Sequence, residues 1–424
     1  MSNSKANLKV LTVVVFSLLF SPFSFSNNAL EVLHFWTSPG EANALNVVKE
    51  EIDLQGYQWQ DFVVVGGGGE AARASLKKRL FAGNPPAAAT LKGLTLKRWA
   101  SLGYLRTLDE MANNQNWHDR IPKAVAEQVQ HRGAFIAAPI NIHSSNWMWV
   151  NAPVLAKHNL TLPNNWQEFE TLLKTLQQLG VTPIVHVDQA WQDATLFESV
   201  LLSVAGPDTY RRAFIDLDFN HLRSKTMVEV FDTLAMLKQY TLRLPADASW
   251  DQATKQVMDG EAAIQFMGDW AKGEFVRFNK QVGKDYLCAM LPGIDQSYIF
   301  MVDAFTTFTD KHNRLRGAQD TLVNAVMNDQ VQLEFNRNKG SLPAVIGEDY
   351  SNEDGCFQTG IRTVTEADKR QQLLPSTAHG LTVSEAIQTE LYNVVHKFMS
   401  GDDLTSEQAV KLLVRRLKYG SYKL

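Results

Sequence analysis

Tryptophan is the residue type in this sequence whose placement could do chemistry, and the chain contains ten of them. Trp36 follows the alternating segment 30–35 and precedes the turn-forming residues 37–40. Trp270 stands at a similar place, directly after Met267-Gly268-Asp269. Ligands of open α/β sheets bind beyond the carboxyl ends of the strands, where an indole can stack on the C–H face of a pyranose. Together, Trp36 and Trp270 favour a sugar-binding surface over plain core packing.

Two other tryptophans have a different pattern. Trp147 and Trp149 alternate along a predicted strand, so their side chains point to the same face. We expect at least one of them to lie in the core.

Motifs for catalysis or cofactor binding are weak. Gly66–Gly69 lacks the ending and the spacing of a phosphate-binding loop, so a tight turn with close backbone approach is the expected role. No serine-hydrolase elbow and no His-Glu-x-x-His helix is found. Asp269 and Glu274 could form a carboxylate pair for glycoside hydrolysis, but a helix cap and a solvated face are the simpler roles. Cys and His do not occur at metal-binding spacing, and we expect neither a metal nor another cofactor.

The N-terminus has the three-part layout of a secretory signal peptide. Lys5 and Lys9 precede an apolar run from 10 to 25, and Ser24-Phe25-Ser26 supplies small residues where a signal peptidase cuts. The run contains Pro22 and is short for a bilayer span, which needs about 20 residues. An uncleaved anchor is the alternative. We expect residues 1–26 to be removed and the protein to be free in the periplasm.

Length, charge and cysteines limit the remaining classes. Residues 27–424 are enough for two domains. The formal net charge is −4, or −6 without the two leader lysines, and no basic patch or tail stands out, so nucleic acid is not an expected partner. Cys288 and Cys356 are the only cysteines in the sequence. They can pair in an oxidising compartment, and two buried thiols are the alternative.

The mature chain begins with strands and helices in alternation. Segment 30–35 alternates like a strand, 41–51 has helical spacing, 61–65 is a second apolar strand, and 70–81 is a second helix. This order predicts a βαβ sheet flanked by helices. No low-complexity linker separates two halves, which suggests that the chain crosses between the domains more than once.

Capping signals predict several later elements. Asn164 with Gln167 indicates the start of a helix over 166–179, and Ser249 with Gln252 starts a helix that Gly260 ends. A short strand over 262–266 follows, and Gly268-Asp269 opens another helix. Thr405 with Gln408 caps an amphipathic helix over 409–419.

Six stretches, in order along the chain, resemble the periplasmic sugar-binding proteins of ABC-type transporters, and more specifically their glucose-binding branch. These stretches are 33–42, 58–61 with the glycines after it, 138–147, 191–195, 265–274 and 338–343. The resemblance implies a family 1 extracellular solute-binding protein. Its fold class is α/β: a two-lobed periplasmic binding protein of type II with a hinged cleft, each lobe a sheet flanked by helices.

The resemblance also implies where the chain passes between the lobes. Crossings are expected near 138–141, 301–303 and 339–340. The expected organisation is a signal peptide at 1–26, an N-terminal lobe at 27–138 and 302–338, and a C-terminal lobe at 139–301 and 339–424.

Sugar contacts are likewise implied by the family pattern. The implied ligand-binding residues are Phe35, Trp36, Glu41, Lys92, Trp270, Asp303, Lys339 and His379. Trp36 and Trp270 would stack on the sugar, and the charged side chains would form charge-assisted hydrogen bonds with its hydroxyls.

Two positions depart from the family pattern. Phe35 stands where Trp is usual, which reduces the stacking surface. Met301 stands where an Asn would bond a hydroxyl, and a thioether is only a weak acceptor. We therefore expect weak glucose binding or preference for another sugar.

The function expected from these observations is capture of a glucose-like monosaccharide and delivery to an ABC-type permease, without catalysis and as a monomer. The alternatives are the same fold binding another sugar or a disaccharide, a secreted carbohydrate-active enzyme, and a protein that has lost sugar binding.

Overall fold

The computed structural model describes residues 28–64, 69–294, 297–310, 312–346, 349–401 and 403–422. The expected signal peptide and the glycines at 66–68 lie outside these ranges. Gly69 is described: it has a φ of 83° and directly precedes a helix. A positive φ of this size suits glycine.

The first of two large sheets belongs to the N-terminal lobe. Its strand order is β2-β1-β3-β14-β6. Strand β1 pairs in parallel with β2 and β3, whereas β14 is antiparallel to β3 and β6. The strands are β1 (Ala29–His34), β2 (Gln58–Val63), β3 (Ala88–Leu91), β6 (Ala138–Pro139) and β14 (Ala304–Thr307). The early β–α–β alternation is thus confirmed.

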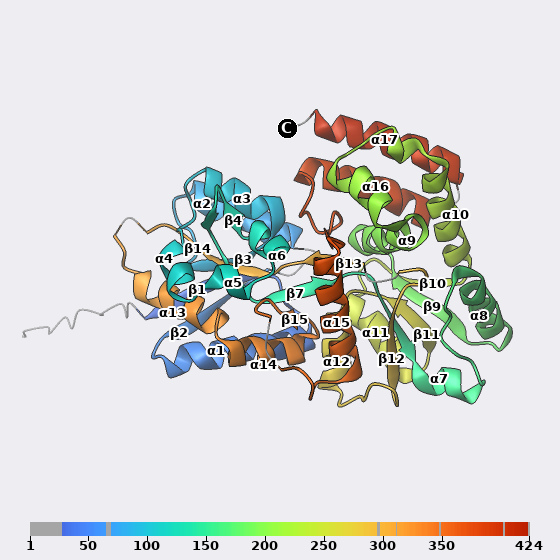
Figure 1. Cartoon of the computed structure of the whole chain (residues 1–424), viewed down its shortest axis with the longest axis horizontal. Coiled ribbons are helices and arrows are strands. Elements are labelled where there is room, and N and C mark those ends of the chain that lie inside the picture. Colours follow the sequence, from blue (N-terminus) through green and yellow to red (C-terminus); the bar gives the residue numbers. More distant parts are fainter. Residues whose placement is uncertain are drawn as a thin grey trace, which may run out of the picture.

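The second large sheet belongs to the C-terminal lobe and has the order β10-β9-β11-β8-β12. Its strands are β8 (Trp147–Asn151), β9 (Thr182–Val187), β10 (Thr241–Leu244), β11 (Ala262–Phe266) and β12 (Tyr286–Met290). In Figure 1 the two sheets lie in separate halves of an elongated molecule, each covered by helices. Helices alternate with sheet layers, as the predicted two-lobed α/β class requires.

A smaller sheet lies between these halves. It has the order β15-β7-β13-β16 and consists of β7 (Asn141–Ser144), β13 (Tyr298–Met301), β15 (Leu342–Pro343) and β16 (Leu373–Pro375). Three of its strands are connected directly to elements of the N-terminal half. Strand β7 follows β6, β13 precedes β14, and β15 follows α14 (Asp329–Lys339). These connections lie at the positions expected for the crossings. The residue boundaries of the lobes stay a prediction.

The helices follow the predicted spacing closely. Those of the N-terminal half are α1 (Pro39–Leu54), α2 (Glu70–Phe81), α3 (Gly93–Ser101), α4 (Asp109–Asn114), α5 (Trp117–Arg120), α6 (Lys123–Gln128), α13 (Arg316–Val326) and α14; a hairpin of β4 (Gln130–His131) and β5 (Ala134–Phe135) accompanies them. Those of the other half are α7 (Ala152–Lys157), α8 (Trp166–Gln178), α9 (Ala190–Tyr210), η1 (Arg211–Ile215), η2 (His221–Arg223), α10 (Lys225–Gln239), α11 (Trp250–Asp259), α12 (Ala271–Arg277), α15 (Gly355–Lys369), α16 (Glu385–Ser400) and α17 (Ser406–Ser421). Among the described residues, none of the helices combines the length and the apolar character that crossing a membrane would require.

Local capping decides where several helices begin. The capping boxes of Ser249 with Gln252 and of Thr405 with Gln408 are both present. The box predicted at Asn164 is wrong by one residue, because Asn165 is the N-cap and its side chain accepts a hydrogen bond from the Glu168 backbone N–H. Adjacent asparagines satisfy the same sequence signal, and only the backbone geometry decides which of them caps.

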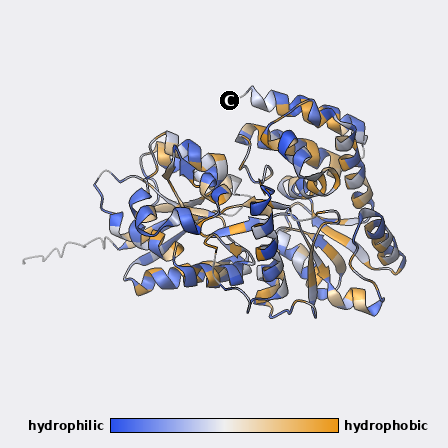
Figure 2. Cartoon of the chain, in the orientation of Figure 1, coloured by the Kyte–Doolittle hydropathy of each residue, from blue (hydrophilic) through white to orange (hydrophobic). Residues whose placement is uncertain are grey.

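The cores are apolar faces turned inward on each half, which Figure 2 shows as mixed colouring along nearly every helix. One cluster includes Leu33 and Val48 of the N-terminal half and continues across the junction to Trp149 and Val257, and the other includes Phe197 and Leu413 of the C-terminal half. Trp147 and Trp149 are both buried and stack on each other with ring centroids 5.9 Å apart. Both are therefore core residues.

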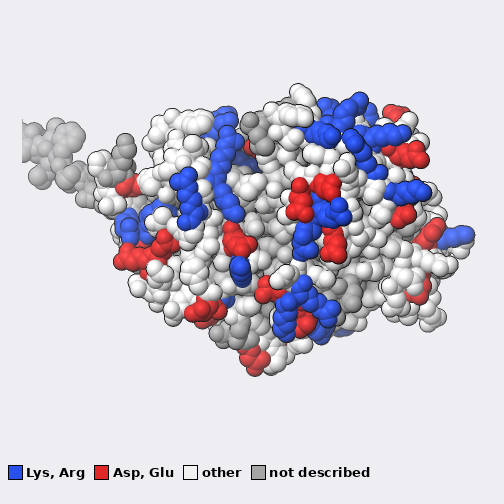
Figure 3. Space-filling view, turned by 45° about the horizontal axis from the view of Figure 1, so that its top comes forward, with Lys and Arg blue, Asp and Glu red and all other residues white. Residues whose placement is uncertain are grey.

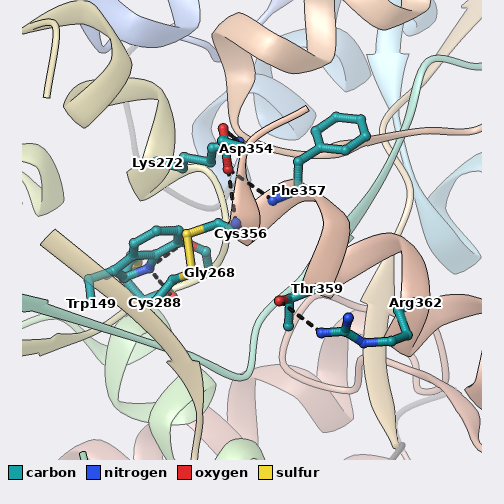
Figure 4. The surroundings of a disulfide bond; sticks show 10 residues. Trp149, Gly268, Lys272, Cys288, Asp354, Cys356, Phe357, Thr359 and Arg362 are labelled. Atoms are coloured by element: carbon teal, nitrogen blue, oxygen red, sulfur yellow. Dashed lines mark hydrogen bonds and ion pairs between the residues drawn. A yellow bond between two sulfur atoms is a disulfide. The ribbon is translucent and has the colours of Figure 1, made fainter. Parts of the chain in front are cut away.

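A disulfide joins Cys288 of β12 to Cys356 in the first turn of α15, with 6.0 Å between the Cα atoms. The alternative of two free thiols does not apply to this structure. Figure 4 shows the bond beside the ion pair of Lys272 with Asp354, which is 2.6 Å long. Because α15 packs on the small central sheet, the bond fastens that sheet to the second large one.

Removing this bond should lower stability. The two cysteines are 68 residues apart, and the double substitution Cys288→Ser/Cys356→Ser should reduce the free energy of unfolding by about 2–4 kcal/mol, since the unfolded chain regains freedom. Urea unfolding followed by tryptophan fluorescence measures this. Unmodified protein treated with dithiothreitol is the matched control, and equal midpoints for all three samples would contradict the expectation.

Candidate functional site

The candidate site is a cavity at the junction of the two halves. Its wall contains all eight residues expected to bind sugar and Met301. The remaining lining residues are Thr37, His143, Trp191 and Trp250. The cavity measures about 60 Å³, room for only a few water molecules. A hexose is larger, so the walls must separate before one can enter.

The N-terminal half supplies residues from loops at the carboxyl ends of its strands. Phe35 and Trp36 directly follow β1, and Lys92 directly follows β3. Trp36 is 2% exposed and packs against Phe305 and Phe335, with ring centroids 5.8 and 5.5 Å away. Among the described residues, its indole nitrogen has no hydrogen-bond partner.

Phe35 is packed differently from Trp36. The Lys92 ammonium lies 5.0 Å from the centre of its ring. A Cβ at Gly69 would come within 3.2 Å of the same ring. Gly69 thus leaves little room behind Phe35.

The C-terminal half supplies an aromatic wall. Trp270 follows β11 and directly precedes α12. Its ring meets His143, His379 and Trp191, with centroid distances of 5.5, 5.6 and 6.4 Å. Trp250 begins α11 and completes this wall. The indole of Trp270 is therefore held from several sides.

Two ion pairs lie at the cavity wall. The Lys339 ammonium is 2.9 Å from Glu41 Oε1, and both side chains are largely buried. Lys339 also lies 5.9 Å from the centre of the Trp36 ring. Lys92 lies 3.6 Å from Asp303 Oδ1. The charged groups of the cavity thus nearly balance, which suits an uncharged polar ligand.

Asp303 is buried where the chain passes from β13 to β14. Burial alone would raise its pKa, but Lys92 and His143 hold the pKa of this carboxyl well below its usual range. Its backbone N–H donates to Asn141 Oδ1 over 2.9 Å. An ionised Asp303 can only accept hydrogen bonds, so it suits a ligand hydroxyl group that donates one.

His143 was not among the expected site residues, and it lies between two carboxylates. Its Nδ1 contacts Asp269, and its Nε2 is 3.3 Å from Asp303 Oδ2. Burial would lower its pKa, but Asp269 and Asp303 raise the pKa above the ordinary value of 6.5. The sequence feature that could have identified His143 as a site residue is its position in β7, beside the expected crossing at 138–141. The two carboxylates that flank it are 126 and 160 residues away in the sequence, so residue spacing could not predict this contact.

The expectations for Asp269 and Glu274 were wrong. Asp269 caps no helix: its carboxylate accepts from the Ser144 backbone N–H over 2.9 Å and contacts His143. Glu274 is not solvated but 2% exposed, and its Oε1 accepts from the Gly40 backbone N–H over 2.9 Å. Burial raises the pKa of Glu274. Glu274 therefore joins the two halves, and Asp269 joins the second half to the small central sheet.

His379 lies on the opposite side of the cavity, in the loop after β16. Its Nδ1 is 2.9 Å from Ser376 Oγ, and burial lowers its pKa. A second, larger cavity of about 740 Å³ begins at His379, Phe35 and Lys92 and extends between α2, α3 and the start of α16. We call it the outer chamber.

Comparison with known proteins gives the same picture. Residues 59–313 match the family model described as bacterial extracellular solute-binding protein. The chain is 41% identical over 385 residues, 91% of each chain, to a "probable sugar-binding periplasmic protein" of Brucella suis. It is 26% identical over 254 residues, 56% of this chain and 45% of the other, to the "glucose-binding protein GlcS" of Saccharolobus solfataricus. Among solved structures it resembles the bacterial solute receptor AcbH, described as preferring β-D-galactopyranose, with a TM-score of 0.77, 14% identity and coverage of 93% and 99%.

The histidine between the carboxylates should make stability depend on pH. Because the folded-state pKa of His143 is raised, its stabilising charge is fully present below 6.5 and is lost as pH rises through the folded-state pKa. The melting temperature should therefore fall as pH increases above 6.5, and His143→Gln should flatten this slope. Thermal unfolding from pH 6 to 9 tests it.

His396 is the control for that experiment. A hydrogen bond to Asp193 raises its pKa as well, but it does not line the cavity. His396→Gln should leave the His143 share of the slope in place. A slope that His143→Gln does not change would show that His143 is neutral throughout this range.

Proposed function

The chain belongs to the bacterial extracellular solute-binding proteins, and on this premise we propose that it is a periplasmic receptor for a monosaccharide. Glucose or a close relative would bind in the cavity between the lobes. The loaded protein, a monomer, would then deliver the sugar to an ABC-type importer in the inner membrane. The observation that carries the proposal is the meeting of two indoles and balanced charged groups, supplied by both halves, in one enclosed cavity.

The chemistry of the cavity supports a pyranose as the ligand. Trp36 and Trp270 offer apolar ring faces for the C–H groups of a sugar. Asp303 and Glu41 offer acceptors, and Lys92 and Lys339 offer donors for its hydroxyls. Because the cavity wall carries similar numbers of carboxylates and ammonium groups, the cavity has no strong preference for a charged solute.

The mechanism we propose is closure about the three crossings, without a chemical step. In the structure the walls lie too close for a sugar to enter, so an open form must precede binding. A ligand that contacts Trp36 on one lobe and Trp270 on the other binds the closed form better and shifts the population toward it. Asp269 and Glu274, the carboxylates that a hydrolase could have used, are engaged in contacts between protein elements.

A disaccharide is the second candidate. The outer chamber shares the wall residues Phe35, Lys92 and His379 with the site and has room for a further sugar ring. Thr90, Ser384 and Gln388 are polar residues in its wall. This chamber is the observation that favours a longer ligand.

The proposal predicts stoichiometric sugar binding that depends on Trp270. Calorimetric titration with glucose, galactose and common disaccharides should give one site per chain, and Trp270→Ala should weaken binding at least tenfold, about 1.4 kcal/mol. Trp166→Ala is the control, because Trp166 begins α8 and does not line the cavity. Conversion of any sugar to product would instead indicate an enzyme. No heat and no thermal shift with any sugar would indicate a protein without this function.

Position 301 should set the affinity for glucose. Met301 is buried at the end of β13 and lines the cavity. Met301→Asn offers a sugar hydroxyl a hydrogen bond in place of a weak thioether contact, which is worth about 1 kcal/mol. Glucose affinity should therefore rise roughly fivefold, while Met267→Asn would not reproduce the gain because Met267 is not a lining residue. Nanomolar glucose binding by the unmodified protein would refute the role given to Met301.

A further inference from the structure

A long groove lies on the C-terminal half, away from the sugar site, between α17 and the segment formed by η2 and the start of α10. It encloses about 650 Å³. Val228, Val410 and Val414 line it together with Tyr422, which is 82% exposed. Val410 and Val414 are themselves buried, and the apolar surface open to water includes the rings of Tyr419 and Tyr422, which are 51% and 82% exposed. Exposure of such surface to water is unfavourable. We call this feature the basic groove, for the charges described next.

Five cationic side chains surround this apolar surface: Arg223, Lys225, Lys411, Arg415 and Lys418. Glu407 is the one acidic residue among the described residues that line it. Within the described ranges, no carboxylate forms an ion pair with any of the five, whereas Lys92 and Lys339, the lysines that line the cavity between the halves, are both paired. The groove therefore carries uncompensated positive charge.

The charges come from two separate parts of the chain, which is why no basic patch is visible in the sequence. Lys411, Arg415, Lys418 and Tyr422 recur at helical spacing along one face of α17. The opposite face of α17 is buried and carries Leu413 and Leu417. Packing of α17 against α10 and η2 then brings Arg223 and Lys225 to the other side of the groove.

The cations on that second side do not stabilise their own helix. Lys225 is the first residue of α10, and Ser224 between it and Arg223 is the N-cap. Positive charge at a helix N-terminus is unfavourable because the helix dipole is positive there. Two cations at this position add to the positive potential of the groove and do not stabilise α10.

The helix that forms one side of the groove lies on the same side of the molecule as the outer chamber. The outer chamber is bounded by α2, α3 and the start of α16, and α17 packs on α16. Figure 1 shows α2, α3, α16 and α17 along the same upper side of the molecule. Figure 3 brings that side forward, and Lys and Arg side chains gather over the end of the molecule that holds α17.

We propose that the basic groove docks an acidic, amphipathic helix of the membrane importer. The apolar floor would receive the apolar face of that helix, and the surrounding cations would pair with its carboxylates, as in other helix-in-groove complexes. The concave shape favours a helix over an anionic membrane surface, which is flat and would reach only the rim. The proposal rests on the proposed function, because a receptor that delivers its solute needs a docking partner.

The test uses a fluorescent synthetic helical peptide with glutamates on one face and leucines on the other, titrated against the full protein. Anisotropy should report saturable binding, and Lys411→Gln/Arg415→Gln should weaken it at least tenfold. Both residues are exposed, so the fold should persist, which thermal unfolding checks. Arg362→Gln/Lys369→Gln on α15 removes the same charges from another exposed helix face and should leave binding unchanged.

Three results would overturn the proposal. The first is equal peptide affinity for the unmodified protein and the α17 variant, or equal affinity for a peptide with glutamines in place of glutamates. The second is binding to phosphatidylglycerol vesicles without binding to the peptide, which would assign the groove to a membrane surface. The third is a dimer in light scattering that the α17 substitutions dissociate. Sugar titration of the same samples is independent of these results, so failure of the proposed function is seen separately.

Discussion

The buried carboxylate of Asp303 is the group on which the rest of this structure depends. An isolated ion at this depth would be costly, because the interior cannot solvate it as water does. Its charged partners come from two separate parts of the chain, Lys92 after β3 and His143 in β7, and Asn141 of β7 accepts from the Asp303 backbone N–H. Keeping Asp303 ionised therefore requires the N-terminal half, the crossing strands and the small central sheet to be assembled together. Lys92 and His143 also line the cavity between the two halves.

Other buried polar contacts also join parts of the chain that are far apart in the sequence. Glu274 of α12 accepts from the backbone at the start of α1, and Lys339 at the end of α14 pairs with Glu41 of α1. Each contact joins residues more than 200 positions apart. A group that loses its partner would remain buried and unpaired, which costs more than the contact itself contributes. The arrangement in the structure is thus held in part by a few buried polar pairs.

Much of the fold could be predicted from short-range signals. The strand over 262–266, the helix over 70–81 and the capping boxes at Ser249 and Thr405 occur as expected, because caps and periodicity depend on residues a few positions apart. The error at Asn164 has the same origin: two adjacent asparagines give one signal. The expected sugar-binding residues came from the family resemblance. Thr37, His143, Trp191 and Trp250 were not expected, since nothing local distinguishes a tryptophan that lines a cavity from one in a core.

The sequence by itself determined the export signal pattern, the alternating α/β order, the family and the residue types available for a sugar. Tertiary structure alone decided which of these residues meet. It placed His143 between two carboxylates, buried Glu274 against the start of α1, put both Trp147 and Trp149 in the core, joined Cys288 to Cys356, and assembled a basic groove from two distant segments. The physical reason is range. Helix caps and periodic faces depend on neighbours in the chain, whereas charge pairing and cavity walls depend on distances between residues that only packing brings together.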